Sequence, residues 1–329
     1  MARVKSTMKT LYSPTTDHSI WSGRADPQDA EYVYQTIQFL DLNHLIGPVK
    51  GGYALLGFES DTGVTRNQGN AGAKEGPASF RRALAKFPIH SSLNLYDAGN
   101  VTCLNGDLET AQTELSIQTS NILSHNLIPV VIGGGHETAW GHFQGVTKHY
   151  QEADVAILNF DAHFDLRPLI DGKFGSSGTP FWQINDLLTS SSKPFNYYCA
   201  GIQPFSNTNT LFNYAKENHV QYLLAEQIHA NPHDLSFIEN IIQSHQHIYV
   251  SICLDVFSAT LTPGVSAPQV LGIGATYVIE ALKLLRDSGK VISLEIVELA
   301  PAYDTNAQTA KLAASLLMTF LTKSHNKCR

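Results

Sequence analysis

The sequence is poor in several features that mark whole classes of protein. Charged residues make up only 16% of the chain, and no stretch approaches the roughly 20 apolar residues of a membrane-spanning helix. The four cysteines (Cys103, Cys199, Cys253 and Cys328) show no C-x-x-C spacing, which favours reduced thiols over a disulfide framework. Lysine and arginine do not cluster and the net charge is −7, so we expect no nucleic-acid partner. The first residues lack the apolar stretch of a signal peptide, so we predict a cytoplasmic protein with no membrane partner.

The sequence does contain enough apolar material for a large core, with 43% hydrophobic residues. Short apolar segments alternate with segments that repeat apolar residues every three or four positions, which is typical of a doubly wound α/β protein with a parallel sheet. We predict strands over 52–58, 128–132, 155–160, 196–202, 220–224, 248–254 and 291–297, and helices over 77–87, 108–125, 210–219, 235–245 and 275–287. No low-complexity linker divides the chain, so we predict one domain over 1–329, with residues 1–50 as an N-terminal extension packed on it.

Three of the predicted strands end in side chains that can bind a metal. The segments are Gly133–Glu137 (GGGHE), Asn159–Arg167 (NFDAHFDLR) and Ser251–Asp255 (SICLD). Ligands of open parallel sheets bind beyond the carboxyl ends of the strands, so the three segments are expected at one edge. Taken singly, His136 is more often a satisfied core histidine, and Asp255 can simply cap a loop. Their coincidence at three strand ends favours a metal centre.

The second segment is the most specific of the three. Asp161, His163 and Asp165 alternate, so their side chains point to one side while the chain stays extended. Two carboxylates and an imidazole that converge there are stable only if a cation lies between them. This donor set suits Mn, Zn, Fe or Ni, and an oxygen-rich set favours Mn. The alternative is a solvated, acidic strand end.

These segments resemble the G-G-x-H, D-A-H-x-D and S-x-D-x-D motifs of the arginase/agmatinase (ureohydrolase) family, whose members bind two Mn²⁺ ions. The resemblance covers about residues 52–301. It implies an arginase-like, three-layer α/β/α fold with a central, mainly parallel sheet. It also implies a hydrolase that acts on C–N bonds of linear amidines, and a homo-oligomer.

By position, the resemblance implies six metal ligands and one acid that faces the substrate. One Mn²⁺ is expected on His136, Asp161, Asp165 and Cys253, and the other on Asp161, His163, Cys253 and Asp255. Glu298 falls where the family places the carboxylate that receives the cationic end of the substrate. Without the resemblance, the preferred interpretation of Glu298 is a surface glutamate at a strand end.

Cys253 departs from the family, which has an aspartate at this position. A thiolate can bridge two metals, and a soft sulfur would shift the preference from Mn toward Zn or Fe. Alternatively, Cys253 is a small buried apolar side chain and one metal position is weak. The sequence leaves these alternatives, and thus the occupancy of the second metal position, open.

Further positions separate the chain from arginases and concern the substrate. Ser177 stands where arginases have a histidine thought to shuttle protons, in an H-G-x-P stretch whose glycine is Gly178 here, and we assign Ser177 and Gly178 to substrate binding. Arg167 offers a bidentate clamp for a substrate carboxylate, or it forms an ion pair with Asp165. Arg66 is a second candidate for the carboxylate, or a surface residue of a loop.

Four stretches, 57–84, 161–168, 176–181 and 262–268, are most similar to the branch of the family that acts on a formimino derivative of glutamate. This similarity implies a small-molecule substrate, N-formimidoyl-L-glutamate, that is hydrolysed in histidine degradation to L-glutamate and formamide. A metal-activated water would attack the formimino carbon, with Asp165 carrying the proton and Glu298 holding the cationic nitrogen. The alternatives are a ureohydrolase that releases urea (an agmatinase, guanidinobutyrase or arginase), a non-catalytic paralogue with an impaired metal site, and a deacetylase-like amidohydrolase on a related fold.

Overall fold

A ten-stranded sheet forms the centre of the computed structural model, which describes residues 11–15, 17–25, 28–45 and 49–323. The strand order is β1-β4-β3-β5-β10-β9-β6-β7-β8, with β2 paired to β4. The pairing of β1 with β4 is antiparallel and the other strand pairs are parallel. The expected central, mainly parallel sheet is therefore confirmed. Of the four cysteines, Cys328 lies outside the described residues.

The strands and helices alternate along most of the chain. The strands are β1 Tyr12–Ser13, β2 Gln38–Phe39, β3 Gly52–Glu59, β4 Leu95–Thr102, β5 Leu127–Ile132, β6 Val155–Phe160, β7 Tyr197–Ile202, β8 Gln221–Leu224, β9 His247–Cys253 and β10 Val291–Val297. The α-helices are α1 Val33–Thr36, α2 Thr62–Arg66, α3 Gly76–Leu84, α4 Leu108–Ser124, α5 Thr138–His149, α6 Pro180–Ser190, α7 Asn209–Glu217, α8 Ala225–Ala230, α9 Ser236–Ser244, α10 Ala275–Ser288 and α11 Gln308–Leu321.

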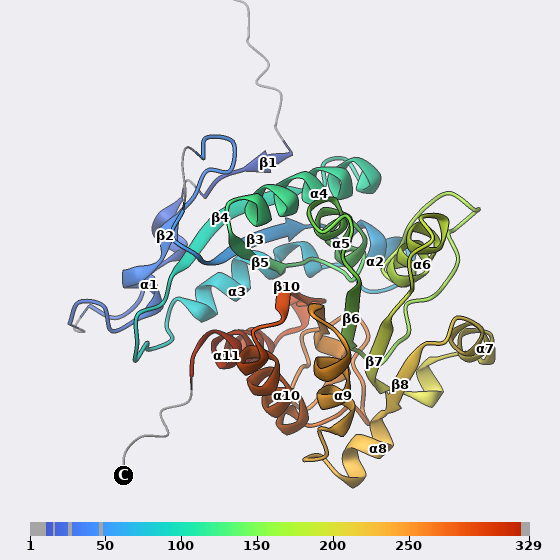
Figure 1. Ribbon diagram of the computed structural model, residues 1–329. Helices are drawn as coiled ribbons and strands as arrows, with labels where there is room; N and C mark the ends of the chain where they lie inside the picture. Colours follow the sequence, from blue (N-terminus) through green and yellow to red (C-terminus); the bar gives the residue numbers. More distant parts are fainter. Residues whose placement is uncertain (1–10, 16, 26–27, 46–48, 324–329) are drawn as a thin grey trace, which may run out of the picture.

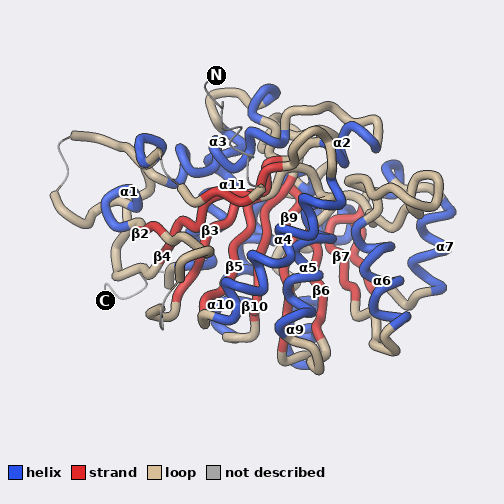
Figure 2. Tube along the Cα trace, turned by 90° about the horizontal axis from the view of Figure 1, so that it is seen from above, coloured by secondary structure: helices blue, strands red, loops and turns tan. Residues whose placement is uncertain are grey.

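Helices cover both faces of the sheet, which gives three layers (Figures 1 and 2). Helices α3, α8, α9, α10 and α11 pack on one face, and α4, α5, α6 and α7 on the other. Successive residues of a strand face opposite layers, as the period of two requires. In β9, Ile248, Val250 and Ile252 join the first layer, and Tyr249 joins the second. Both faces of the sheet are thus buried, which is why the strands are apolar on nearly every residue.

All the predicted strands and helices are present, with ends shifted by at most three residues. The prediction missed several elements, including β4, α5, α6 and α11. Helix α5 was missed because Gly141 and Gly145 lower its helix propensity. Packing requires both glycines: a Cβ on Gly141 would lie 2.7 Å from the carbonyl oxygen of Gln112 on α4, and one on Gly145 would lie 2.6 Å from that of Ser116.

The strand order brings the ends of four strands together. β5 and β6 follow one another in the sequence, but β10 and β9 lie between them in the sheet. These two strands come from the end of the chain, after it has passed through β7 and β8 at the far edge (Figure 1). Because the four strands are parallel, the carboxyl ends of β5, β10, β9 and β6 lie side by side at one edge of the sheet.

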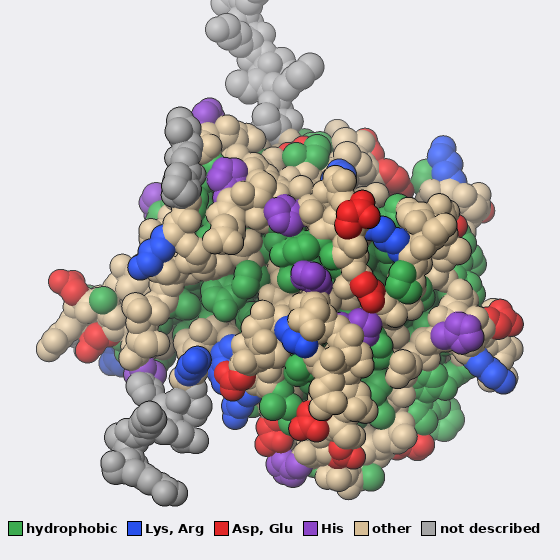
Figure 3. Space-filling model, viewed as in Figure 1, with side chains coloured by type: hydrophobic (Ala, Val, Ile, Leu, Met, Phe, Trp, Pro, Cys, Tyr) green, Lys and Arg blue, Asp and Glu red, His purple; other side chains and the backbone are tan. Residues whose placement is uncertain are grey.

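On the face drawn in Figure 3, positive and negative side chains are interspersed, with apolar side chains between them. Among the described residues, no helix combines the length and the apolar character needed to cross a membrane.

A buried ion pair anchors β4 and part of the N-terminal segment. Arg81 on α3 binds Asp97 on β4 through two hydrogen bonds, from Nε at 3.0 Å and Nη2 at 2.8 Å. Trp21, from the segment before α1, donates its indole N–H to the same carboxylate at 2.8 Å. Asp97 and Arg81 are at most 3% exposed. These contacts account for the presence of a charged residue in the buried strand β4. They also connect β4 to α3 and to the segment before α1.

We expect Asp97→Asn to destabilise the protein by about 3–5 kcal/mol, because the buried Arg81 guanidinium would lose its counter-charge. Urea unfolding monitored by circular dichroism measures this change. The control is Asp287→Asn, which removes the partner of Arg286 at an exposed ion pair and should leave the unfolding midpoint unchanged. An equal loss in both variants would contradict the role given to Asp97.

Candidate metal centre

The edge formed by β5, β10, β9 and β6 carries the acidic and imidazole side chains that the sequence singled out. His136 follows β5, the residues 161–165 follow β6, Asp255 follows β9, and Glu298 follows β10. Cys253 is the last residue of β9. Residues at or just beyond the carboxyl ends of four neighbouring strands thus lie in one place, as expected for a ligand site in an open parallel sheet.

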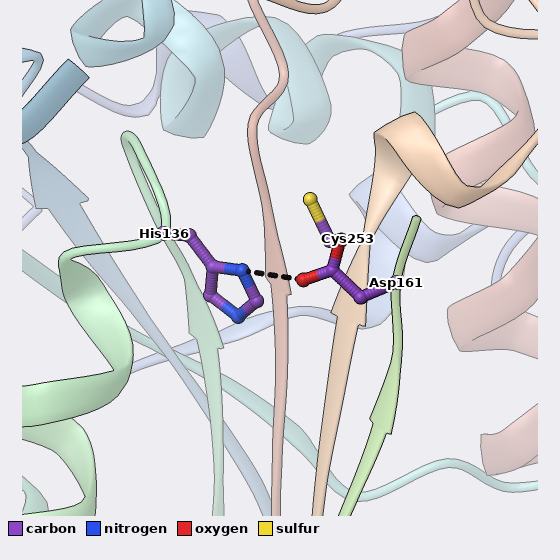
Figure 4. A group of neighbouring side chains, drawn as sticks. All are labelled: His136, Asp161 and Cys253. Carbon is purple, nitrogen blue, oxygen red and sulfur yellow. Dashed lines mark ion pairs between the residues drawn. The ribbon is translucent and has the colours of Figure 1, made fainter. Parts of the chain in front are cut away.

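The first group of possible ligands consists of His136, Asp161 and Cys253, whose donor atoms all lie within 4.8 Å of one another. In Figure 4 the carboxylate of Asp161 points at the His136 ring, and the Cys253 sulfur lies beside that carboxylate. The distance from His136 Nδ1 to Asp161 Oδ2 is 2.9 Å. Asp165 joins this side of the site, because its Oδ2 also lies 2.9 Å from His136 Nδ1.

The second group consists of Asp161, His163 and Asp255, again within 4.8 Å of one another. His163 Nδ1 lies 3.5 Å from Asp161 Oδ1 and 3.3 Å from Asp255 Oδ2. Asp161 belongs to both groups and faces each with a different oxygen. Asp161 would therefore contribute to holding an ion in either group.

The convergence of Asp161, His163 and Asp165 does not come from an extended chain alone. β6 ends at Phe160, and Asp165 has a left-handed backbone with a φ of 49°. The alternation correctly indicated that the three side chains gather, but the turn at Asp165 is what directs its carboxylate to His136. Single-sequence patterns do not show this turn, because left-handed backbone at a non-glycine residue is uncommon.

The buried atoms of this site fit a cation. His136 Nδ1 makes no hydrogen bond to any described residue, although two carboxylate oxygens lie 2.9 Å away. Burial raises the pKa of Asp165, and the nearby Asp161 carboxylate raises it further. Burial also raises the pKa of Asp255. Three carboxylates and two imidazoles packed at such distances with an unsatisfied nitrogen form a donor set that a divalent cation would satisfy.

Cys253 has the surroundings of a ligand and of a core residue at once. Its side chain is buried, and its sulfur lies 2.9 Å from Asp255 Oδ1. Burial raises the pKa of the Cys253 thiol well above its ordinary value, and the carboxylates of Asp161 and Asp255 raise it further. The thiol therefore holds its proton in the metal-free protein, and a metal would have to displace that proton in order to bind the sulfur.

Glu298 faces the same site from β10, in a strained position. Its backbone is left-handed, with a φ of 69°. One carboxylate oxygen accepts a hydrogen bond from the backbone N–H of His136 at 2.9 Å, and the other is buried with no partner among the described residues. Burial raises the pKa of Glu298 well above its ordinary value. Glu298 is thus a buried acid rather than the surface glutamate that its local sequence suggests, and its free oxygen calls for a polar or cationic partner.

A cavity of about 330 Å³ opens above these residues and contains the expected substrate-binding positions in part. Its lining includes His136, His163, Asp165, Cys253, Asp255 and Glu298 together with Arg167, Ser177, Asn67, Asn70 and Ser266. Arg167 is exposed, and its guanidinium forms no ion pair with any described residue, so the alternative pairing with Asp165 does not occur. Gly178 packs between Arg167 and Asn67, since a Cβ there would lie 3.0 Å from Arg167 Cδ and 3.1 Å from Asn67 Nδ2.

Arg66, the second arginine that the sequence suggested, does not line this cavity. Its guanidinium binds Glu109 at 2.6 Å and the carbonyl oxygen of Gly175 at 3.0 Å, and it lies over the Phe174 ring. Arg66 therefore connects the loop after β3 to the loop that leads to Ser177.

Sequence reasoning missed Asn67 and Glu137, which adjoin residues that it had singled out. Asn67 donates a hydrogen bond to Ser177 Oγ at 3.1 Å. Glu137 is fully buried and accepts hydrogen bonds from Ser60 Oγ and from the backbone N–H of Gly63, both at 2.9 Å. Burial raises the pKa of Glu137 to about 7. Glu137 thereby holds the loop after β3, which bears Asn67, against the loop that bears His136.

Comparison with known proteins finds relatives over almost the whole chain. A family model described as the arginase family matches residues 52–322. The formimidoylglutamase of Legionella pneumophila is 41% identical over 307 residues, which are 92% of this chain and 95% of the relative. The formimidoylglutamase of a Geobacillus species is 39% identical over 321 residues, which are 95% of this chain and 97% of the relative.

Solved structures resemble the chain as well. The formimidoylglutamase of Bacillus subtilis has a TM-score of 0.75 and 25% identity, covering 84% of this chain and 87% of that one. A variant of the Trypanosoma cruzi formiminoglutamase, solved with Mn²⁺, also has a TM-score of 0.75 and 25% identity, covering 82% of this chain and 91% of that one.

Proposed function

Because this chain belongs to the arginase family, we propose that it hydrolyses N-formimidoyl-L-glutamate to L-glutamate and formamide, a step of histidine degradation. The observation that carries this proposal is the division of the cavity into two chemically different parts. The cavity lining includes acids and imidazoles of the metal centre with Glu298, which we call the floor, and Arg167, Ser177 and Asn67, which we call the wall. Arg167 forms no ion pair with any described residue. A substrate with a cationic amidine at one end and carboxylates at the other matches both parts.

Mn²⁺ is the ion that this proposal assigns to the centre. His136, Asp161, Asp165 and Cys253 would hold one ion, and Asp161, His163, Cys253 and Asp255 the other. Oxygen and imidazole donors suit Mn²⁺, and one similar structure was solved with it. Bound ions would lower the pKa of a water molecule so that it becomes a nucleophile near neutral pH.

The residues of the floor would orient the reacting group and move its proton. The unpartnered oxygen of Glu298 would accept a hydrogen bond from the cationic formimino nitrogen and place the formimino carbon beside the nucleophile. Water oxygen bonds to that carbon, and the bond from the carbon to the glutamate nitrogen breaks. Asp165 would accept the water proton and return it to the departing amine, which leaves formamide and glutamate.

The wall of the cavity would select the glutamate end. Arg167 can bind a carboxylate through two parallel hydrogen bonds, because no described residue occupies its guanidinium. Ser177 and Asn67 supply a hydroxyl and an amide on the same wall, and they are already joined to each other. Gly178 allows Arg167 and Asn67 to lie this close together, because a Cβ at this position would crowd both side chains. The homo-oligomeric state and the cytoplasmic location expected from the sequence stay predictions.

A product assay tests the proposed reaction. After reconstitution with Mn²⁺, we expect formamide and glutamate from N-formimidoyl-L-glutamate and no urea from arginine, agmatine or guanidinobutyrate. Release of urea as the main product would show that the chain is instead a ureohydrolase of the guanidino type. Absence of turnover with every substrate, at full metal loading, would favour a non-catalytic relative.

Arg167→Ala should raise KM for N-formimidoyl-L-glutamate roughly 10-fold or more and change kcat little, because a charged hydrogen bond of about 1.5–3 kcal/mol is lost in ground state and transition state alike. Steady-state kinetics and the metal content, which should be unchanged, measure this effect. Arg82→Ala, an exposed arginine on α3 outside the cavity, is the control. Unaltered KM in Arg167→Ala would remove Arg167 from the substrate site.

Cys253→Asp tests whether position 253 binds metal. If Cys253 is a ligand, the substitution restores an oxygen donor, and we expect tighter Mn²⁺ binding and weaker Zn²⁺ binding than in the wild type. Titration of the metal-free protein with each ion gives the two affinities. Cys199→Ser, at a buried thiol outside both ligand groups, should leave this ratio unchanged. The same Mn²⁺ to Zn²⁺ preference in Cys253→Asp and in the wild type would identify Cys253 as a packing residue.

A further inference from the structure

We propose that three buried residues behind the metal centre, Ser251, Glu295 and His142, set the tautomer and the position of His136 and thereby the metal affinity of the site. We call these three residues the buried relay. They act as positioning residues, since none of them lines the cavity. The inference deepens the proposed metal-dependent function and rests on it for its biological purpose.

The buried relay is a continuous line of hydrogen bonds that leads away from the cavity. His136 Nε2 lies 2.9 Å from Ser251 Oγ, and Ser251 donates its hydroxyl proton to Glu295 Oε1 at 2.9 Å. The other oxygen of Glu295, Oε2, lies 2.8 Å from His142 Nδ1. His142 Nε2 in turn lies 2.6 Å from Ser293 Oγ, which closes the line within the core.

Strand pairing and helix packing build this line. Ser251 on β9 and Glu295 on β10 are direct partners in the parallel register, so their side chains leave the sheet next to each other. They face the layer that contains α5, from which His142 reaches the Glu295 carboxylate. His136 lies in the loop between β5 and α5. Helix α5 therefore begins just after His136 and contains His142, the residue at the far end of the hydrogen-bonded line.

The direction of the hydrogen bonds determines the tautomer of His136. A hydroxyl has one proton, and Ser251 gives it to Glu295. Ser251 Oγ can then only accept from His136, so Nε2 must carry a proton. In a neutral imidazole this leaves Nδ1 with its lone pair, and Nδ1 is the nitrogen that faces Asp161 and Asp165. The buried relay thus selects the form of His136 that can bind a metal through Nδ1.

Burying these polar side chains costs free energy, and the need to fill the core does not explain why they are there. His142, Ser251 and Glu295 are all 0% exposed. Apolar side chains of similar size would fill this space without taking an acid and an imidazole out of water. The polar residues occupy a site that an apolar core would fill more simply, directly behind a metal ligand. This placement points to the positioning of His136 rather than to packing.

The first test measures Mn²⁺ affinity in Ser251→Ala and Glu295→Gln by calorimetric titration of the metal-free proteins at mildly alkaline pH. In Ser251→Ala the His136 Nε2–H loses its acceptor. In Glu295→Gln one of the two carboxylate oxygens, which accept from Ser251 and His142 respectively, becomes an NH2 donor, so one bond must reverse or break. We expect each variant to bind Mn²⁺ roughly 10- to 100-fold more weakly, as for other residues that orient a ligating histidine.

Ser116→Ala is the matched control, because Ser116 on α4 is equally buried and its hydroxyl has no hydrogen-bond partner among the described residues. It should bind Mn²⁺ as the wild type does. Wild-type affinity in Ser251→Ala and Glu295→Gln, or an equal loss in Ser116→Ala, would overturn the proposal. Urea unfolding of the metal-free variants separates a loss of folding from a loss of affinity.

The far end of the buried relay offers a second, independent pair of variants. His142→Asn keeps a side-chain N–H near the position of Nδ1, so it should preserve the bond to Glu295 and most of the Mn²⁺ affinity. His142→Leu removes this donor at a similar volume and should weaken Mn²⁺ binding by more than His142→Asn does. Equal affinities in the two variants would exclude His142 from the line. Because metal binding is measured without substrate, these results hold even if the substrate proves to be a guanidino compound.

Discussion

The chemistry of this protein depends on the adjacency of four parallel strand ends. Hydrogen-bonded strands lie about 4.8 Å apart, so loop residues that follow neighbouring strands are within reach of one another. β10 and β9 enter the sheet between β5 and β6, and this insertion places His136, Asp161, Cys253 and Glu298 around one point. Any shift in the pairing of β9 or β10 would separate the donors, whichever residues the loops carried.

Among the described residues, the buried carboxylate of Asp97 and those of the metal centre differ in how their charge is balanced. Asp97 is balanced by the protein itself, through Arg81 and the Trp21 indole, and it holds segments of the chain together. The carboxylates of the metal centre are gathered around imidazoles, and His136 Nδ1, 2.9 Å from two carboxylate oxygens, makes no hydrogen bond to any described residue. A buried carboxylate whose charge is neutralised by a partner stabilises the fold. A group that lacks such a partner can instead bind a cation.

Two of the residues with a left-handed backbone lie at this centre. Asp165 and Glu298 both have left-handed backbones, which cost free energy at residues other than glycine. In return, Asp165 reaches His136, and Glu298 leaves one oxygen free over the floor of the cavity. The buried core of the surrounding sheet and the hydrogen bond from His136 N–H to Glu298 supply the rigidity that keeps these conformations.

The sequence alone determined the type of fold and most of the side chains that gather in the candidate metal centre. Apolar strands with period two, helices with apolar spacing and acids or histidines at the strand ends are local patterns, so they can be read along one chain. Only the tertiary structure decided the strand order, the turn at Asp165 and the buried state of Glu298. It also showed that Arg167 forms no ion pair with any described residue, whereas Arg66 is bound to Glu109. Each of these depends on contacts between residues far apart in the sequence, such as Ser251 with Glu295, and no local pattern records which distant residue will lie next to another.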